Sequence, residues 1–318
     1  MRWNLSNTPL PYGFLVLGIA FMVLPFRLSA ADELEQHLRD KYDNKTLVLR
    51  DFYRGERLRY DSAGMAIGSA APGDWTVNGF VRVTSLSLSG QGLTVQADRL
   101  SLVDSGQSFQ FQQSGVKKKE KAKKMSGLRI EVEFDPSGIT AEKADAALSR
   151  IFLTNEDRFA DLVPDYWKPC ALAASTGKAR KQYIACGFPP EFAAIPGVVP
   201  KPDERAESVQ GGDGEAKVSD LQVVPVGKGV TPPRRISGSD PDWSSTEERQ
   251  LGYHGGIGLL IVVDKAGQVR NIRVSKPLGL GLEHEAVEAV AKWRFEPAEK
   301  DGLPVAVEIG VQIDFHLY

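Results

Sequence analysis

The sequence is poor in the residues from which metal and redox sites are built. It has two cysteines and four histidines in 318 residues. The histidines are scattered and form no H-x-x-x-H or H-E-x-x-H pattern, which removes the usual helical zinc motifs. No G-x-S-x-G or Walker A segment occurs either. We therefore expect no enzyme, no cofactor and no metal. The histidines are His37, His254, His284 and His316.

No charge of one sign dominates the chain. There are 39 lysines and arginines against 41 acidic residues, which gives a formal net charge of −2. That balance argues against a protein that binds nucleic acid through bulk electrostatics. The basic run from Lys117 to Lys124 suggests a membrane or nucleic-acid surface, but a solvated hairpin loop is the better interpretation in a net-acidic chain. We expect no nucleic-acid partner.

No apolar run reaches the roughly 20 residues of a helix that spans a bilayer. The longest covers residues 12–26, with Arg2 before it and small residues after it. This pattern is typical of a secretory signal peptide over residues 1–30, cut after Ala30 or Ala31. The alternative is an uncleaved inner-membrane anchor through residues 12–26. Both interpretations predict export.

The two cysteines, Cys170 and Cys186, fit export. An even pair in an exported chain favours one disulfide, whereas no C-x-x-C spacing supports a redox role. In the chain-entropy model, closing a loop of this size contributes about 3 kcal/mol to stability.

Residues 31–190 predict a β-rich N-terminal domain with helical segments. Alternating apolar and polar residues predict strands, and Gly90 to Gly92 permits a tight turn between two of them. Helices are expected from Leu34 to Tyr42 and, after a cap at Thr140, to Ile151. The ligand of this domain stays open. The strand patterns are Thr46–Phe52, Trp75–Leu88, Leu93–Val103, Phe109–Gln113 and Leu128–Phe134.

Residues 191–229 predict a linker, because prolines crowd its first part and glycines its second. The chain is long enough for two domains with separate cores, one on each side of this segment.

The last 89 residues, 230–318 and hereafter the C-terminal unit, have the clearest pattern. Gly256–Asp264 and Val269–Ser275 predict a hairpin, and an amphipathic helix follows from Leu282 to Trp293. Val305–Tyr318 then alternates strictly between apolar and polar residues, which predicts a strand. The order β-β-α-β predicts one helix on a three-stranded antiparallel sheet, so the whole chain belongs to the α+β class.

The C-terminal unit resembles the C-terminal domain of the TonB family, because several short motifs occur in the family's order. The resemblance covers under a third of the chain and leaves the N-terminal domain unrecognised. The motifs are Pro232-Pro233-Arg234, Pro241-Asp242-Trp243-Ser244, Gly256 before the apolar strand, Val263-Asp264-x-x-Gly267, Gly279-Leu-Gly281-Leu-Glu, Trp293-Arg-Phe295-x-Pro297-Ala298 and Asp301-Gly302-x-Pro304-Val305.

The resemblance implies a place in the periplasm of a Gram-negative bacterium and a role in TonB-type transport. Family members bind a segment of an outer-membrane receptor by strand addition, in which backbone hydrogen bonds supply much of the contact. The expected edge is the last strand, and a receptor or another envelope protein is the expected partner; a dimer stays open. The candidate partner-binding residues are Glu308, Gly310, Gln312, Asp314 and Phe315.

Two features depart from energised family members. Those keep a transmembrane helix that meets proton-channel partner proteins, and a long spacer follows it. Here the apolar run is short and a domain of about 150 residues intervenes. An anchored chain would still have proton-channel partners. The alternative is a non-energised periplasmic adaptor or scaffold, whose N-terminal domain binds a separate ligand.

The stretch VAKWRFEPAEKDGLP, residues 290–304, looks at first like a binding triplet. Trp293 falls on the apolar stripe of the helix and Phe295 can fold back over the helix end, while Pro297 prevents the helix from continuing. Gly302 and Pro304 belong to a turn into the last strand. We interpret the stretch as a structural joint.

Overall fold

A computed structural model gives the structure of the chain. It describes residues 29–90, 92–105, 109–113, 127–135, 138–176, 186–188, 190–198, 221–227, 229–241 and 254–315. The predicted signal peptide or anchor over residues 1–28 and the basic run at Lys117–Lys124 lie outside the described residues.

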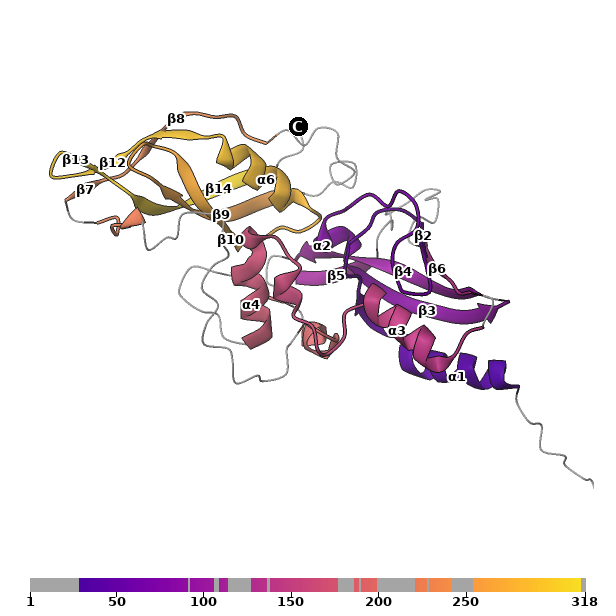
Figure 1. Ribbon diagram of the computed structural model, residues 1–318. Helices are drawn as coiled ribbons and strands as arrows, with labels where there is room; N and C mark the ends of the chain where they lie inside the picture. The colour runs from indigo at the N-terminus through magenta and orange to yellow at the C-terminus, as the bar shows by residue number, and fades with distance from the viewer. Residues whose placement is uncertain are drawn as a thin grey trace, which may run out of the picture.

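The N-terminal region, residues 29–198, is built on one sheet of six strands (Figure 1). Five of them follow the order β1-β3-β4-β6-β2, and β5 pairs with the far part of β4. All pairs are antiparallel except β2 with β6. The strands are β1 (Thr46–Val48), β2 (Arg57–Tyr60), β3 (Phe80–Ser89), β4 (Gly92–Asp104), β5 (Phe109–Gln113) and β6 (Gly127–Glu133).

Two helices, α1 (Ala30–Tyr42) and α3 (Ala141–Ile151), share a hydrophobic cluster with one face of this sheet. The α3 helix is capped by Thr140 and buries the expected stripe, so that prediction is confirmed. The α1 helix begins at Ala30, earlier than the predicted Leu34, because the Ser29 hydroxyl and the Asp32 carboxylate form a capping box.

The predicted strand at Trp75–Leu88 is wrong in its first part. Residues Trp75–Asn78 form a short helix, α2, because the Asp74 carboxylate caps it by accepting a 2.8 Å hydrogen bond from the Thr76 backbone N–H. The strand β3 starts only at Phe80.

Short helices complete the N-terminal region and bury an aromatic cluster. They are η1 (Phe159–Asp161), η2 (Asp165–Trp167), α4 (Lys168–Thr176) and η3 (Pro190–Ala194). The predicted linker was to begin at residue 191, but Phe192, Ile195 and Val198 are buried in the core. The segment 191–198 is therefore packed, since its apolar side chains fill space beside Phe80 and Phe159.

In the C-terminal unit, a three-stranded antiparallel sheet has the order β10-β9-β14. The pairing of β14 with β9 is regular over nine residues, from Val307 opposite Val263 to Phe315 opposite Gly255. The helix α6 joins β10 to the segment before β14. The elements are β9 (Gly255–Val263), β10 (Val269–Lys276), α6 (Leu282–Ala291) and β14 (Val307–Phe315).

Five short strands, which the sequence did not reveal, surround this sheet. The pair β11-β8 and the three-stranded set β13-β12-β7 form two small ladders. Asp301 and Gly302 both have positive φ between β12 and β13, which confirms the predicted turn. The predicted last strand is divided at Ala306. The short strands are β7 (Val230–Thr231), β8 (Arg234–Ser237), β11 (Arg294–Glu296), β12 (Ala298–Lys300) and β13 (Leu303–Val305).

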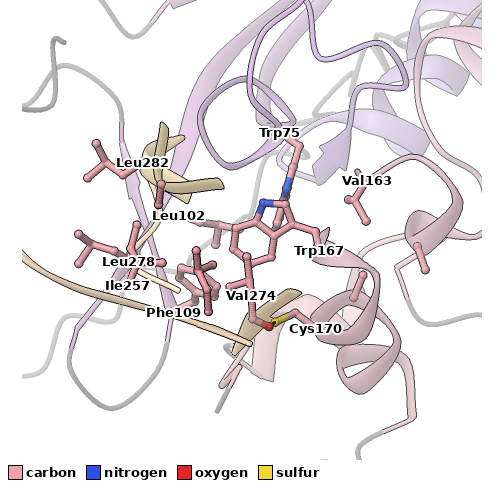
Figure 2. Packing of buried hydrophobic residues seen from close by; sticks show 14 of the residues in the cluster. Trp75, Leu102, Phe109, Val163, Trp167, Cys170, Ile257, Val274, Leu278 and Leu282 are labelled. Carbon is pink, nitrogen blue, oxygen red and sulfur yellow. Dashed lines mark hydrogen bonds between the residues drawn. The ribbon is translucent and has the colours of Figure 1, made fainter. Parts of the chain in front are cut away.

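The core does not divide between the two regions. One hydrophobic cluster contains Trp75, Leu102 and Trp167 from the N-terminal region together with Ile257 and Val274 from the C-terminal unit. Figure 2 shows these side chains facing one another across the boundary. The predicted mixture of helices and strands is confirmed. The prediction of two domains with separate cores does not fit this cluster, because it contains residues of both regions. Within the described ranges, no helix has the length and hydropathy needed to cross a membrane.

Candidate functional site: an edge strand and the joint that positions it

The strand β14 forms one margin of the C-terminal sheet. Among the described strands it pairs only with β9. At its first residue a linker residue lies alongside: the Val224 backbone N–H donates a 2.8 Å hydrogen bond to the carbonyl oxygen of Ala306, and Val224 bridges Val307 in parallel. This contact shows that the outer side of the strand accepts a parallel neighbour, and it leaves the stretch after Val307 as the candidate edge.

The predicted partner-binding residues lie along this stretch but differ in exposure. Gly310, Gln312 and Asp314 are exposed, and the amide of Gln312 donates a 2.6 Å hydrogen bond to the Asp314 carboxylate. Glu308 is half-buried in an ion pair with Arg273 of β10. The side chain of Phe315 has no exposed surface. A partner strand would therefore meet backbone and short polar groups, with the Phe315 ring holding the strand end in the core.

Gly310 is the open position of the strand. A methyl group built on its Cα would have no heavy atom within 4 Å. The face of the sheet is therefore open at this position among the described residues, because the Cβ of a strand residue points out of the plane of the sheet.

The opposite margin of the sheet, β10, lies against the N-terminal region. Both η2 and α4 contact it, and Figure 1 shows α4 beside β10. The Sγ atom of the buried Cys170 lies 3.5 Å from the carbonyl oxygen of Val274. Cys170 forms the predicted disulfide with Cys186. Among the described residues, the β10 margin is thus covered by helices of the N-terminal region, whereas the β14 margin carries the contact with Val224 at its first residue.

The loop between β10 and α6 continues this attachment by pairing with β4. The Asp104 backbone N–H donates to the Leu278 carbonyl at 2.9 Å, and the Leu280 N–H donates to the Leu102 carbonyl at 3.1 Å. Between them, Gly279 has φ +93°, and a Cβ there would lie 2.1 Å from the Leu102 carbonyl oxygen. Only glycine satisfies both conditions.

Trp293 acts as a structural anchor, as the sequence predicted. It is buried, and its indole N–H donates a 2.9 Å hydrogen bond to the carbonyl oxygen of Ser239. The Arg235 guanidinium lies 4.2 Å from the ring centroid. At Gly238, a Cβ would lie 2.2 Å from the tryptophan ring, so the backbone passes directly over it.

Phe295 lies in β11 rather than over the helix end. Its backbone N–H donates to the Gly267 carbonyl at 2.9 Å. A Cβ on Gly267 would lie 1.8 Å from the Phe295 carbonyl oxygen, which explains why these two motif positions occur together. Pro297 separates β11 from β12, and Pro304 pairs with Glu299 beyond the turn at Gly302. Residues 290–304 thus form the end of α6 and a series of short strands that lead into β14.

Two histidines pair with carboxylates on separate elements. His37 of α1 lies 3.7 Å from Asp145 of α3, and His284 lies 3.3 Å from Glu288 within α6. Within the part of the chain that the structure describes, no group of three or more His, Cys, Asp or Glu side chains is placed to hold a metal ion.

Two elements of the site escaped the sequence analysis. Val224 lies in the predicted linker, and its only signal was the short apolar stretch Leu221–Val226. The pairing of Gly279 with Val103 gave no local signal, because the two residues are far apart in the chain.

Comparison with known proteins identifies the C-terminal unit. Residues 245–317 match the family model described as Gram-negative bacterial TonB protein C-terminal. This segment is a TonB-family C-terminal domain, as its motifs predicted. The family is associated with TonB-dependent transport in the cell envelope, and its C-terminal domain is a non-enzymatic interaction domain.

Among solved structures, the chain is similar to the solution NMR structure of the Pseudomonas aeruginosa TonB C-terminal domain. The two are 20% identical, and the match covers 30% of this chain and 95% of that one, with a TM-score of 0.23. No curated protein matches the chain.

Proposed function

We propose that this chain is a periplasmic envelope protein that binds a short segment of an outer-membrane receptor by strand addition along β14. The observation that carries the proposal is the nine-residue pairing of β14 with β9, which leaves a long, regular strand at the margin of the sheet. The hydrogen-bonding groups of such a margin are a template for another extended chain.

The other margin of the sheet supports the same choice. Because η2, α4 and the disulfide region pack on β10, a partner strand has no comparable approach there. The Val224 contact adds direct support, since it is a parallel backbone pairing on the outer side of β14. A receptor segment would extend the same kind of pairing over Glu308–Asp314.

One observation favours a second function, that of a non-energised adaptor or scaffold. The TonB-family domain shares its core with the N-terminal region and so does not hang on a free spacer. A fixed domain cannot reach far from the place where the N-terminal region is held. In this function the N-terminal sheet would bind a separate ligand, and β14 would recruit an envelope protein without transmitting force.

The mass of the N-terminus distinguishes an anchored transducer from a free adaptor. Cleavage after Ala30 or Ala31 would release the protein into the periplasm and rule out proton-channel partners. Retention of residues 1–30 would support an inner-membrane anchor instead. Mass spectrometry of the protein exported by a Gram-negative host gives the answer.

Binding itself is tested with the full chain and a purified outer-membrane receptor from the same bacterium. The receptor is prepared with and without its periplasmic N-terminal segment. We expect binding only when the segment is present. Equal binding of both receptors, or of neither, would contradict strand addition to a receptor segment.

A further inference from the structure

Two carboxyl groups lie at the joint where the TonB-family domain docks on the N-terminal region. The first belongs to Asp74, the cap of α2. Its Oδ1 accepts hydrogen bonds from the Thr76 backbone N–H at 2.8 Å and from the Thr76 hydroxyl at 2.5 Å. The same hydroxyl accepts a 2.8 Å hydrogen bond from the backbone N–H of Gly281 in the TonB-family domain.

The second carboxyl belongs to Glu283 in the first turn of α6. It has no exposed surface, and its Oε1 accepts hydrogen bonds of 2.6 Å from the backbone N–H groups of Leu278 and Gly279. These residues form the loop that pairs with β4. The other oxygen, Oε2, is buried and has no hydrogen-bond partner among the described residues.

Gly281 lets the start of α6 approach Asp74 closely, because it carries no side chain. A Cβ on Gly281 would lie 3.2 Å from the Cβ of Asp74, and Glu283 follows two residues later. Burial first, and the nearby charge of Asp74 second, raise the pKa of Glu283 to about 7, against the opposing backbone hydrogen bonds from Gly279 and Leu278. Burial also raises the pKa of Asp74, against the opposing hydrogen bonds from Thr76.

Other titratable groups face this pair from each neighbouring element. His284 of α6 and Arg54 of the loop before β2 both favour the charged form of Asp74. Tyr166 of η2 lies 3.4 Å from the His284 ring, and burial together with the charges of Asp74, Glu283 and Glu288 raises the pKa of that phenol. Neither His284 nor Arg54 forms a described ion pair with Glu283.

We propose that the Asp74–Glu283 pair makes docking of the TonB-family domain on the N-terminal region depend on protons. The docked form holds a proton on Glu283, and the joint loosens when both carboxyls are ionised. This is a switch in the fold that is independent of what binds β14.

The direction follows from linkage. Undocking returns Glu283 to water, where its pKa is near 4.5, so the docked form binds more protons. Docking is therefore strongest at low pH and weakens as the pH rises through the window from 4.5 to about 7. One linked proton changes the docking equilibrium by about tenfold per pH unit inside that window.

Amide hydrogen exchange in the full chain measures the docking equilibrium. The informative amides are those of Leu280, Gly281 and Asp104, which bridge the two regions. After correction for intrinsic exchange, we expect their protection to fall at least tenfold between pH 5.5 and 7.5. Amides of β3 and β4 before Leu100 belong to the N-terminal sheet and serve as an internal reference whose protection stays constant.

Two variants make the test specific. Glu283→Gln keeps an acceptor for Leu278 and Gly279 but cannot ionise, so its joint should stay protected and independent of pH. Glu288→Gln, on the exposed side of the same helix, should behave like the wild type. If Glu283→Gln does not fold, Asp74→Asn replaces it. The fall in protection between pH 5.5 and 7.5 should then be smaller than in the wild type, because loss of the neighbouring charge lowers the pKa of Glu283 and narrows the window.

Constant protection of the wild-type joint across this pH range would overturn the proposal. So would an unchanged pH dependence in Glu283→Gln or, where that variant does not fold, in Asp74→Asn.

Discussion

The hydroxyl of Thr76 accepts a 2.8 Å hydrogen bond from the backbone N–H of Gly281, a residue 205 positions further along the chain. Around this bond, the loop before α6 pairs with the end of β4 through Leu102 and Asp104. The TonB-family domain is thus attached to the N-terminal region by backbone hydrogen bonds as well as by a shared core. The attachment fixes the direction in which β14 faces.

Gly279 should be the least replaceable residue of this attachment. In Gly279→Ala the new Cβ would lie 2.1 Å from the Leu102 carbonyl oxygen, at a backbone conformation that is already unfavourable. We expect the free energy of unfolding to fall by about 3 kcal/mol or more, measured by denaturant titration.

Gly302→Ala is the matched control for that experiment. Gly302 has φ +74°, but a Cβ there meets nothing within 4 Å. Its cost should be limited to the backbone term of about 1–2 kcal/mol. Equal costs for the two variants would show that the contact with Leu102 does not matter.

Arg99 should be essential for holding the end of α2 and the loop between β1 and β2 in place. Its buried guanidinium donates to the carbonyl oxygens of Asn78, Tyr53 and Gly55. Arg99→Met would leave these acceptors without a donor, and we expect a loss of about 2–4 kcal/mol in unfolding free energy. Arg99→Lys should recover only part of this stability, because a single ammonium nitrogen cannot replace the two guanidinium nitrogens that donate to the three carbonyl oxygens.

The effect of Arg99 should not vary between pH 5 and 8. Desolvation lowers the pKa of this guanidinium to about 10. Arg99 of the wild type therefore stays charged over the whole range from pH 5 to 8. A stability loss that varied with pH in this window would contradict a constant positive charge.

The disulfide should stabilise the region that covers β10. Reduction of Cys170–Cys186 should lower the free energy of unfolding by about 3 kcal/mol, since the bond closes a loop with a sequence separation of 16. The double variant Cys170→Ala/Cys186→Ala should not respond to reductant. A reductant effect of the same size in that variant would mean that the bond is not its cause.

A pair of substitutions at Gly310 should separate backbone pairing from side-chain contact. Gly310→Ala keeps the N–H and has room for its methyl group, so receptor binding should be unchanged. Gly310→Pro removes the N–H and should weaken binding at least tenfold. Thermal unfolding of both variants checks that the sheet is intact. Equal loss of binding in both would favour a side-chain contact instead.

The sequence predicted most elements whose causes are local. The alternation in Val305–Tyr318 predicted β14, and Asp301-Gly302 predicted the turn before it, because each pattern follows from backbone geometry within a few residues. The family motifs at Gly267 and Phe295 were recognised too. Their reason, a contact between two backbones, became visible only in the structure.

What the sequence did not predict depends on contacts between distant segments. The packed segment 191–198 looked like a linker because prolines crowd both sides of it, yet Phe192 and Ile195 are buried in the aromatic core. The short strand β8 forms because Arg235 and Ser237 find partners in β11, about sixty residues later. Glu283 was recognised only as the last residue of a family motif, and its complete burial became visible only in the structure.

The central claim, strand addition to β14, is tested most directly by cysteine cross-linking. Single cysteines at Gly310 and Gln312 of the full chain are paired with cysteines at successive positions of the receptor's periplasmic segment, with Lys292→Cys on the exposed end of α6 as control. We predict that each of the cysteines at Gly310 and Gln312 forms disulfide-linked products with every second position of the receptor segment. The best partner of Gln312 should lie two residues along the segment from the best partner of Gly310. The cysteine at Lys292 should give no product. Cross-links without that register, or equally strong at Lys292, would contradict the account.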